Sequence, residues 1–137
     1  MSTEILTDNV ATVAAIYEAF GRGDVPFILS NIADNCHWEA MGKGSSAQGG
    51  TYTGKGASEF FNNLLGEVEF LEFNPLTINN AGKNTVAAFG NLKGKSRATG
   101  KAYNTNWAMR WVFNDEGQVI EYNNYHDTAA LYMANQN

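Results

Sequence analysis

Near its end the chain carries a histidine and an aspartate side by side, His126 and Asp127, in the stretch "EYNNYHDTAALYM". A histidine oriented by a carboxylate is a frequent general base, because the carboxylate stabilises the protonated imidazole. Residues 119–126, however, have the composition of a strand, in which adjacent side chains point to opposite faces. The two groups therefore cannot form a dyad. We expect Asp127 instead to cap a final helix over residues 128–133, which stabilises it by about 1 kcal/mol.

The same alternation groups four side chains on the face that we expect to point inward: Ile120, Tyr122, Asn124 and His126. Among them His126 is the group that titrates near neutrality, since its unperturbed pKa is about 6.5 and burial lowers it. It is the candidate acid or base. The alternative is a histidine at the rim of a pocket that bonds a carbonyl or a water and has no catalytic role.

Asn124 and Tyr17 are the candidates for positioning a ligand. The Asn124 amide can orient a carbonyl or a water but cannot act as a general base. Tyr17 follows Ile16 on the apolar face of the first predicted helix, so its hydroxyl can reach inward. It can equally be a core aromatic whose hydroxyl is bonded within the protein. Tyr122 leaves the same two interpretations open.

A metal or phosphate site is not indicated. His37 and Glu39 lie on the outward parity of their predicted strand, so they do not converge with His126. The glycine-rich stretch "GKGSSAQGG" lacks the lysine-serine signature of a phosphate-binding loop, and we interpret it as a loop at the mouth of a pocket. No dinucleotide pattern is present either. We therefore expect no cofactor and no metal.

Composition narrows the class of protein. Nine Lys and Arg against fourteen Asp and Glu give a net charge of −5, which excludes the concentrated positive face that nucleic acids require. No apolar run approaches the roughly 20 residues of a membrane span, and the N-terminus shows no signal-peptide pattern. We expect a soluble cytoplasmic protein of one domain, residues 1–137, with the lone Cys36 as a small buried hydrophobe.

The elements that must position these residues follow from periodicity. Helices are predicted over residues 9–20 and 25–32, capped by Asp8 and Asp24, and over 57–65, where Phe60, Phe61, Leu64 and Leu65 form the apolar face. A short strand over 36–41 buries its even positions, and a long flexible loop over 42–56 follows. From residue 67 onward the pattern is that of strands, with a bulge expected near residues 70–71 because the apolar parity changes there.

The strand over 102–113 has the clearest alternation in the chain. Its predicted inner face is the set Tyr103, Thr105, Trp107, Met109, Trp111 and Phe113. Helices that come first and antiparallel hairpins that come last indicate an α+β fold.

Five stretches in this order and spacing resemble the SnoaL-like group of the nuclear transport factor 2-like superfamily: "IYEAFGRGDVPFIL", "IADNCHWEAMG", "TYTGKGASEFF", "RATGKAY" and "EGQVIEYNNYHDTAAL". The resemblance implies a cone, in which a curved antiparallel sheet wraps around N-terminal helices and leaves an apolar cavity open at one end. It also implies a homodimer through the outer sheet face, which here would carry Asn104, Asn106, Arg110 and Asn123.

The resemblance implies certain catalytic positions, and at these positions this chain lacks the catalytic residues. Where ketosteroid-isomerase-like members have a basic Asp, an oxyanion Tyr and a second Asp, this chain has Ala40, Ile16 and Met109. None of the three can move a proton or stabilise an enolate. Where cyclases and epoxide hydrolases of the superfamily have an Asp on the last strand, this chain has Asn124.

Three functions remain from the sequence. The first is a cofactor-independent isomerase, cyclase or hydrolase acting on a small hydrophobic molecule, with His126 as acid or base and Asn124 and Tyr17 positioning the substrate. The second is a binding module that holds such a molecule without chemistry, and the third is a dimer whose cone is filled by its own tryptophans. For the first two, the resemblance implies a ligand wall of Ile16, Trp38, Ala40, Phe60, Leu64, Trp107, Met109, Trp111 and Tyr122.

Overall fold

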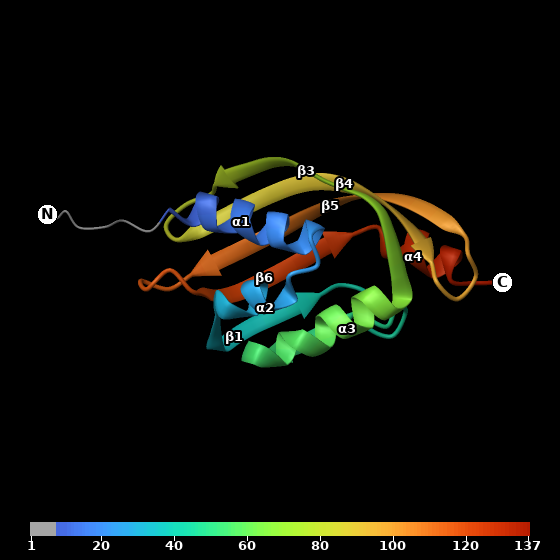
Figure 1. Cartoon of the computed structure of the whole chain (residues 1–137), viewed down its shortest axis with the longest axis horizontal. Coiled ribbons are helices and arrows are strands. Elements are labelled where there is room, and N and C mark those ends of the chain that lie inside the picture. Colours follow the sequence, from blue (N-terminus) through green and yellow to red (C-terminus); the bar gives the residue numbers. More distant parts are fainter. Residues whose placement is uncertain (1–7) are drawn as a thin grey trace, which may run out of the picture.

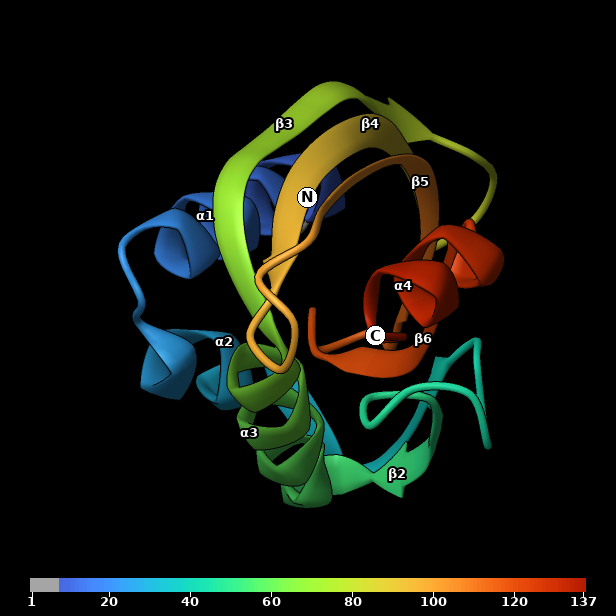
Figure 2. The same cartoon turned by 90° about the vertical axis from the view of Figure 1, so that its right-hand side faces the viewer.

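A six-stranded sheet, bent into a partial cone, is the frame of the computed structural model, which describes residues 8–137. The strand order is β2-β1-β6-β5-β4-β3; β1 and β6 run parallel and all other neighbours antiparallel. The bounds are β1 (Ile32–Ala40), β2 (Gly50–Thr53), β3 (Val68–Asn80), β4 (Thr85–Ser96), β5 (Ala102–Phe113) and β6 (Val119–His126). Figure 2 shows the sheet curving around the interior, which confirms the predicted α+β cone.

The first two helices, α1 (Asn9–Gly21) and α2 (Val25–Ser30), lie on the concave side of the sheet (Figure 1). Both predicted caps are confirmed: Asp8 accepts a hydrogen bond from the Ala11 N–H at 3.0 Å, and Asp24 accepts one from Phe27 at 3.1 Å. Helix α2 ends two residues before its predicted end, because the chain already extends into β1 at Ile32. The predicted strand over 36–41 therefore began four residues too late.

The glycine-rich segment 42–56 is more ordered than predicted. Its second half forms β2, paired with β1 from His37 opposite Thr53 to Ala40 opposite Gly50, and the short 3-10 helix η1 (Gly54–Gly56). The prediction of an unbroken flexible loop was wrong because a backbone ladder at a sheet edge needs no apolar side-chain pattern.

Helix α3 (Ala57–Glu67) covers the end of the cone beside β2. It buries Phe60, Phe61 and Leu64 as predicted. Leu65 is 38% exposed, against prediction, because the next 100° step along the helix turns it off the buried face.

The long strands confirm the strongest patterns of the sequence. All six residues predicted for the inner face of β5 are buried. The parity change in β3 corresponds to irregular pairing between Phe70 and Glu72, with a second irregularity between Pro75 and Thr77. These bulges bend β3, the edge strand that closes over α1.

The last strand departs from strict alternation at its start. Phe113 pairs with Val119 while Val112 pairs with Glu121, so the pairing shifts around Ile120. Val119 is fully buried and Ile120 only partly, which corrects the prediction that Ile120 points inward. Beyond β6, helix α4 (Thr128–Ala134) begins at Asp127, whose side chain accepts from the Ala130 N–H at 3.1 Å and confirms the predicted cap. Among residues 8–137 no helix has the length and hydropathy to cross a bilayer.

Candidate functional site

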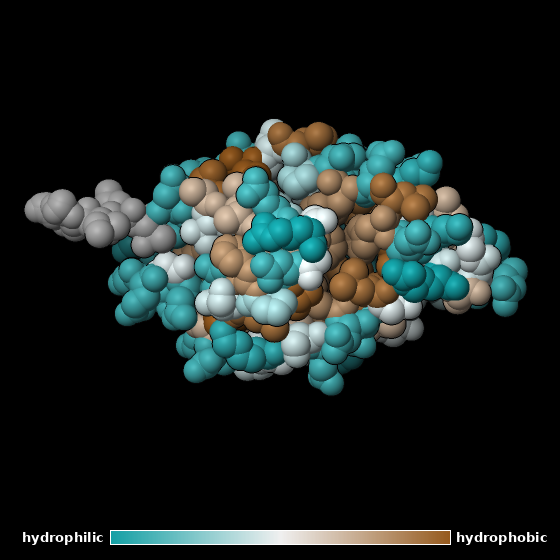
Figure 3. All heavy atoms as spheres, viewed as in Figure 1, coloured by the Kyte–Doolittle hydropathy of each residue, from teal (hydrophilic) through white to brown (hydrophobic). Residues whose placement is uncertain are grey.

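The cone encloses a cavity of about 60 Å³ between its helices and its sheet. Figure 3 shows hydrophobic residues gathered around a hollow between the end of α1, β3 and α3. The cavity is small, since ligand sites usually measure about 300–1,000 Å³ and a cavity of about 150 Å³ holds benzene. In this conformation the side chains of the wall fill most of the cone.

Aromatic rings make up most of that wall. Trp38 stacks on Tyr122 with ring centroids 3.8 Å apart, and Trp107 stacks on Phe73 at 5.0 Å. Gly90 permits the second stack, because a Cβ at this position would lie 2.4 Å from the Trp107 ring. The wall therefore offers aromatic faces and edges to an apolar molecule.

Several polar groups of the wall are bonded to one another. The Trp111 indole donates to the Tyr17 hydroxyl at 3.0 Å, and this hydroxyl donates to the Met109 sulfur at 3.2 Å. The Tyr122 hydroxyl donates to the same sulfur at 3.4 Å. Burial raises the pKa of Tyr17 and of Tyr122 well above the ordinary value, so both stay neutral.

Three other polar atoms on the wall are buried and without a hydrogen-bond partner among the described residues: Trp38 Nε1, Asn124 Oδ1 and His126 Nε2. Such atoms are rare in folded proteins, because leaving one unpaired costs about 1–3 kcal/mol. Asn124 and His126 lie on successive inward positions of β6. Together they form the polar side of an otherwise apolar cavity.

The surroundings of His126 shift its pKa in opposite directions. Burial lowers its pKa, while the carboxylates of Glu67 and Asp127 act in the opposite direction. The imidazole is therefore neutral near pH 7 and able to accept a proton, and two carboxylates are placed to stabilise its charged form. Burial and the Glu67 charge also raise the pKa of Tyr103, on the neighbouring strand, to about 12.

Three of the positions at which the resemblance implies catalytic groups lie in one row across the sheet. Asn124 pairs with Ala40 on one side and with Met109 on the other. Of this row only Asn124 offers a polar side chain. The arrangement can orient a carbonyl, hydroxyl or water at Asn124 and transfer a proton at His126, one position nearer the end of the strand.

Nearly all the residues that the sequence nominated lie around this cavity. Ile16, Tyr17, Trp38, Phe60, Leu64, Trp107, Met109, Trp111, Tyr122, Asn124 and His126 line it. Ala40 is buried beside Asn124 but is not part of the lining. The sequence did not identify the other lining residues, Phe20, Ile28, Gln48, Phe61, Phe70, Phe73, Leu92 and Tyr103, nor Glu67, whose charge acts on His126 and Tyr103. Tyr103 shares the inward parity of β5 and was therefore detectable; Gln48 and Glu67 follow no periodic pattern.

A metal-binding group is not formed by the described residues, among which no three His, Cys, Asp or Glu side chains cluster. His37 is exposed on the opposite face of β1 from Trp38. Its neighbour on that face, Glu39, accepts a hydrogen bond from Asn123 at 3.0 Å.

The sequence model of the SnoaL-like domain matches residues 13–122, and the chain therefore belongs to this family. An NTF2-like protein from Burkholderia thailandensis is 26% identical, with 96% of this chain and 100% of that one covered and a TM-score of 0.85. An NTF2-like protein from Burkholderia pseudomallei is 22% identical over the same shares, with a TM-score of 0.86.

A third solved structure, of TerC co-crystallised with polyporic acid, is 23% identical over 96% of this chain and all of TerC, with a TM-score of 0.79. The two structures below 25% identity show a common fold. A comparison with curated proteins found no significant match.

Proposed function

We propose that this protein binds a small, largely apolar molecule that carries a hydrogen-bonding oxygen, with the ring or chain between the aromatic walls and the oxygen at Asn124 and His126. The observation that carries the proposal is the set of buried, unpaired polar atoms on an aromatic cavity wall, Trp38 Nε1, Asn124 Oδ1 and His126 Nε2. A ligand, or the waters that it displaces, supplies the missing partners. That TerC was co-crystallised with polyporic acid is consistent with a ligand in the same fold.

The volume of about 60 Å³ sets the size of a suitable probe. A single ring already requires the wall to move outward, so single-ring compounds are the appropriate test ligands. We expect phenol to raise the melting temperature in proportion to the logarithm of its concentration above the dissociation constant. Absence of binding by phenol, toluene and acetophenone alike would contradict the proposal and favour a cone filled by its own aromatic residues.

A second candidate function is proton transfer at the bound molecule, favoured by the neutral, half-buried imidazole of His126, whose Nε2 is buried. In this proposal the Asn124 Nδ2–H donates to a carbonyl oxygen, and His126 Nε2 takes a proton from the adjacent carbon and returns a proton to it. The assay is exchange of the acetophenone methyl protons in D₂O, followed by NMR. We expect His126→Gln to lower the protein-dependent exchange rate by about 10²-fold. A rate equal to that of the parent protein would leave binding without chemistry.

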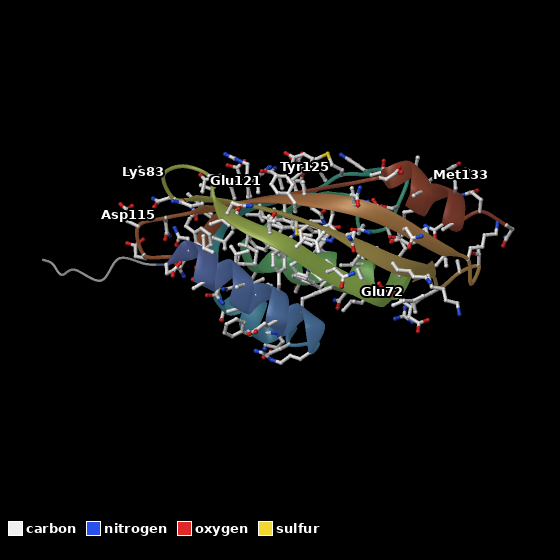
Figure 4. All side chains as sticks on the ribbon, turned by 90° about the horizontal axis from the view of Figure 1, so that it is seen from above. Glu72, Lys83, Asp115, Glu121, Tyr125 and Met133 are labelled. Carbon is white, nitrogen blue, oxygen red and sulfur yellow. The ribbon has the colours of Figure 1, made fainter. Side chains whose placement is uncertain are left out.

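We also propose a homodimer through the outer sheet face. This face is less polar than predicted: Phe89 and Tyr125 are 51% and 44% exposed and flank Ala108 in one row across β4, β5 and β6. Tyr125 and Glu121 project from the side of the sheet opposite to α1 (Figure 4). Arg110 lies beside this row and is bonded to Glu121 and to Asn123, at 3.0 Å each. An apolar row with a polar border is the usual composition of a subunit interface.

A further inference from the structure

Gln48 brings a second amide to the cavity, from a loop rather than from the sheet. It is 3% exposed and lines the cavity together with Asn124 and His126. Within the part of the chain that the structure describes, residues 8–137, its side chain takes part in no hydrogen bond, whereas its backbone does. The amide atoms of Gln48 are not fully buried, so their four hydrogen-bonding positions are open to a ligand or a water.

The backbone on both sides of Gln48 is fixed. The N–H of Ala47 donates to Glu67 Oε2 at 3.0 Å, and the carbonyl of Gln48 accepts from the Tyr52 hydroxyl at 2.9 Å. That hydroxyl in turn accepts from Asn63 at 3.2 Å. These bonds fix the backbone at Gln48, so only its side chain has to be ordered when it bonds a ligand.

The loop itself is closed on its own backbone. The Gly42 carbonyl accepts from the N–H groups of Ser45 and Ser46 at 2.9 and 3.0 Å. Gly49 then passes so near to Gly42 that a Cβ would lie 2.2 Å from the Gly42 carbonyl carbon. The loop over residues 42–49 is thus a compact, preorganised element that presents Gln48 to the cavity.

Glu67 links this loop to the rest of the polar side. Besides Ala47, its Oε2 accepts from the Asn135 amide at 2.9 Å, and its Oε1 is buried without a partner among the described residues. Its charge also acts on His126 and Tyr103, both in the cavity wall. One carboxylate therefore fixes the loop and lies close to the groups that face the ligand.

We propose that Gln48 is a specificity-determining residue of the cavity and that Glu67 is the positioning residue that holds it there. Gln48 adds a hydrogen bond to the ligand oxygen that lies at Asn124 and His126, so the cavity distinguishes a hydroxyl or carbonyl compound from an apolar compound of the same shape. The inference rests on the proposed binding function and adds to it the chemical class of the ligand. A site built to hydrogen-bond a ligand rejects the analogue that leaves its buried polar groups unpaired.

Phenol and toluene provide the test, because a hydroxyl and a methyl group have nearly the same size. Dissociation constants from ligand-detected NMR should show about tenfold tighter binding of phenol by the parent protein. Gln48→Met keeps the length of the side chain without the amide and should reduce the preference to about twofold. Gln118→Met, the same substitution at an exposed turn, should leave it unchanged.

The outcomes distinguish a failure of the binding function from a failure of the role of Gln48. If neither compound binds, the binding function fails and the role of Gln48 fails with it. If both bind and Gln48→Met keeps the parental preference for phenol, the cavity binds ligands but Gln48 does not select them. The same holds if the parent protein itself shows no preference.

The positioning role of Glu67 has its own readout. Glu67→Ala should lower the preference for phenol as Gln48→Met does, while Glu67→Gln, which retains an oxygen for the Ala47 N–H, should restore at least half of it. A general structural defect would weaken phenol and toluene equally and leave their ratio unchanged. An unchanged ratio in Glu67→Ala would overturn the positioning role and leave Gln48 as the selecting residue.

Discussion

Two adjacent asparagines on β6 are equally buried and have opposite surroundings. Asn123 and Asn124 are 5% and 6% exposed. The Asn123 amide is bonded at both ends, to Arg110 and to Glu39, on the outer face of the sheet. Asn124 Oδ1, on the inner face, has no partner within residues 8–137. Asn123 thus contributes to stability. The unpaired oxygen of Asn124 lowers stability, and a hydrogen bond from a ligand offsets this loss.

The two asparagines give the first prediction. Asn124→Leu, which replaces an amide whose Oδ1 is unpaired by an apolar group of similar shape, should raise the free energy of unfolding by about 1 kcal/mol. Asn123→Leu should lower it by about 1–3 kcal/mol, because Arg110 and Glu39 lose their partner. Urea unfolding of both variants measures this difference. A loss of stability at Asn124 as large as that at Asn123 would mean that its amide is already paired in the ligand-free protein.

His126 gives a prediction on pH. Its pKa is lowered in the folded state, mainly by burial, so the unfolded state binds more protons between that pKa and about 6.5. The histidine's contribution to stability is therefore complete above about pH 6.5 and decreases as the pH falls, by up to about 1.4 kcal/mol per pH unit. Urea midpoints of the parent protein and of His126→Gln should diverge below this pH. Parallel curves would contradict a buried, neutral imidazole.

For individual residues, the sequence identified those on strands and missed Gln48, on a loop, and Glu67, the last residue of α3. His126 and Asn124 followed from a two-residue period, and Tyr103 shares the parity of Trp107. Gln48 and Glu67 owe their places to long-range hydrogen bonds, between Ala47 and Glu67 and between Asn135 and Glu67. No local sequence pattern encodes such contacts. The sequence therefore predicted a loop at the mouth of a pocket but not that Gln48 of this loop lines the cavity.

Among the elements, α4 depends most on a single residue. It has seven residues, and its first turn is fixed by Asp127, whose backbone N–H also donates to Thr105 at 2.9 Å. Its C-terminal end is bonded to the β4–β5 turn, where the Thr99 hydroxyl donates to the Ala134 carbonyl at 2.5 Å. The helix therefore closes one end of the cone through bonds at both of its ends.

The cap of α4 gives the third prediction. Asp127→Ala should lower the free energy of unfolding by about 1 kcal/mol, because the Ala130 N–H loses its acceptor. Asp127→Asn, which caps about equally well, should change it little. Equal losses in the two variants would assign the effect to the negative charge beside His126 instead of to the cap. Urea unfolding at pH 7 distinguishes the two.

Elements with regular periods were predictable, and those defined by backbone pairing alone were not. The alternation of β5 and the caps of α1, α2 and α4 were read directly from side-chain types. β2 is four residues of Gly, Thr and Tyr at a sheet edge, and its place depends on β1 offering an open edge. The shift at Ile120 likewise arises from the turn between β5 and β6, which fixes their register.

The molecule as a whole presents an apolar row on its outer face, and this gives the fourth prediction. Phe89→Lys and Tyr125→Lys should each shift the chain from a dimer toward a monomer, because a lysine in the row meets its own copy across a two-fold axis. Met133→Lys, on α4 and 65% exposed, is the matched control and should leave the mass unchanged. Light scattering at several concentrations measures the mass. A parent protein with the mass of one chain would overturn the dimer proposal.

The parallel pairing of β1 with β6 joins the first strand of the chain to the last. During synthesis β1 therefore emerges with its apolar side chains and one open edge, and finds its permanent neighbour only after β6, Val119–His126, has left the ribosome. Contacts so distant in sequence form slowly, and unpaired edges invite association between nascent chains. Chaperone dependence and loss of yield on C-terminal truncation are the expected consequences in a producing cell.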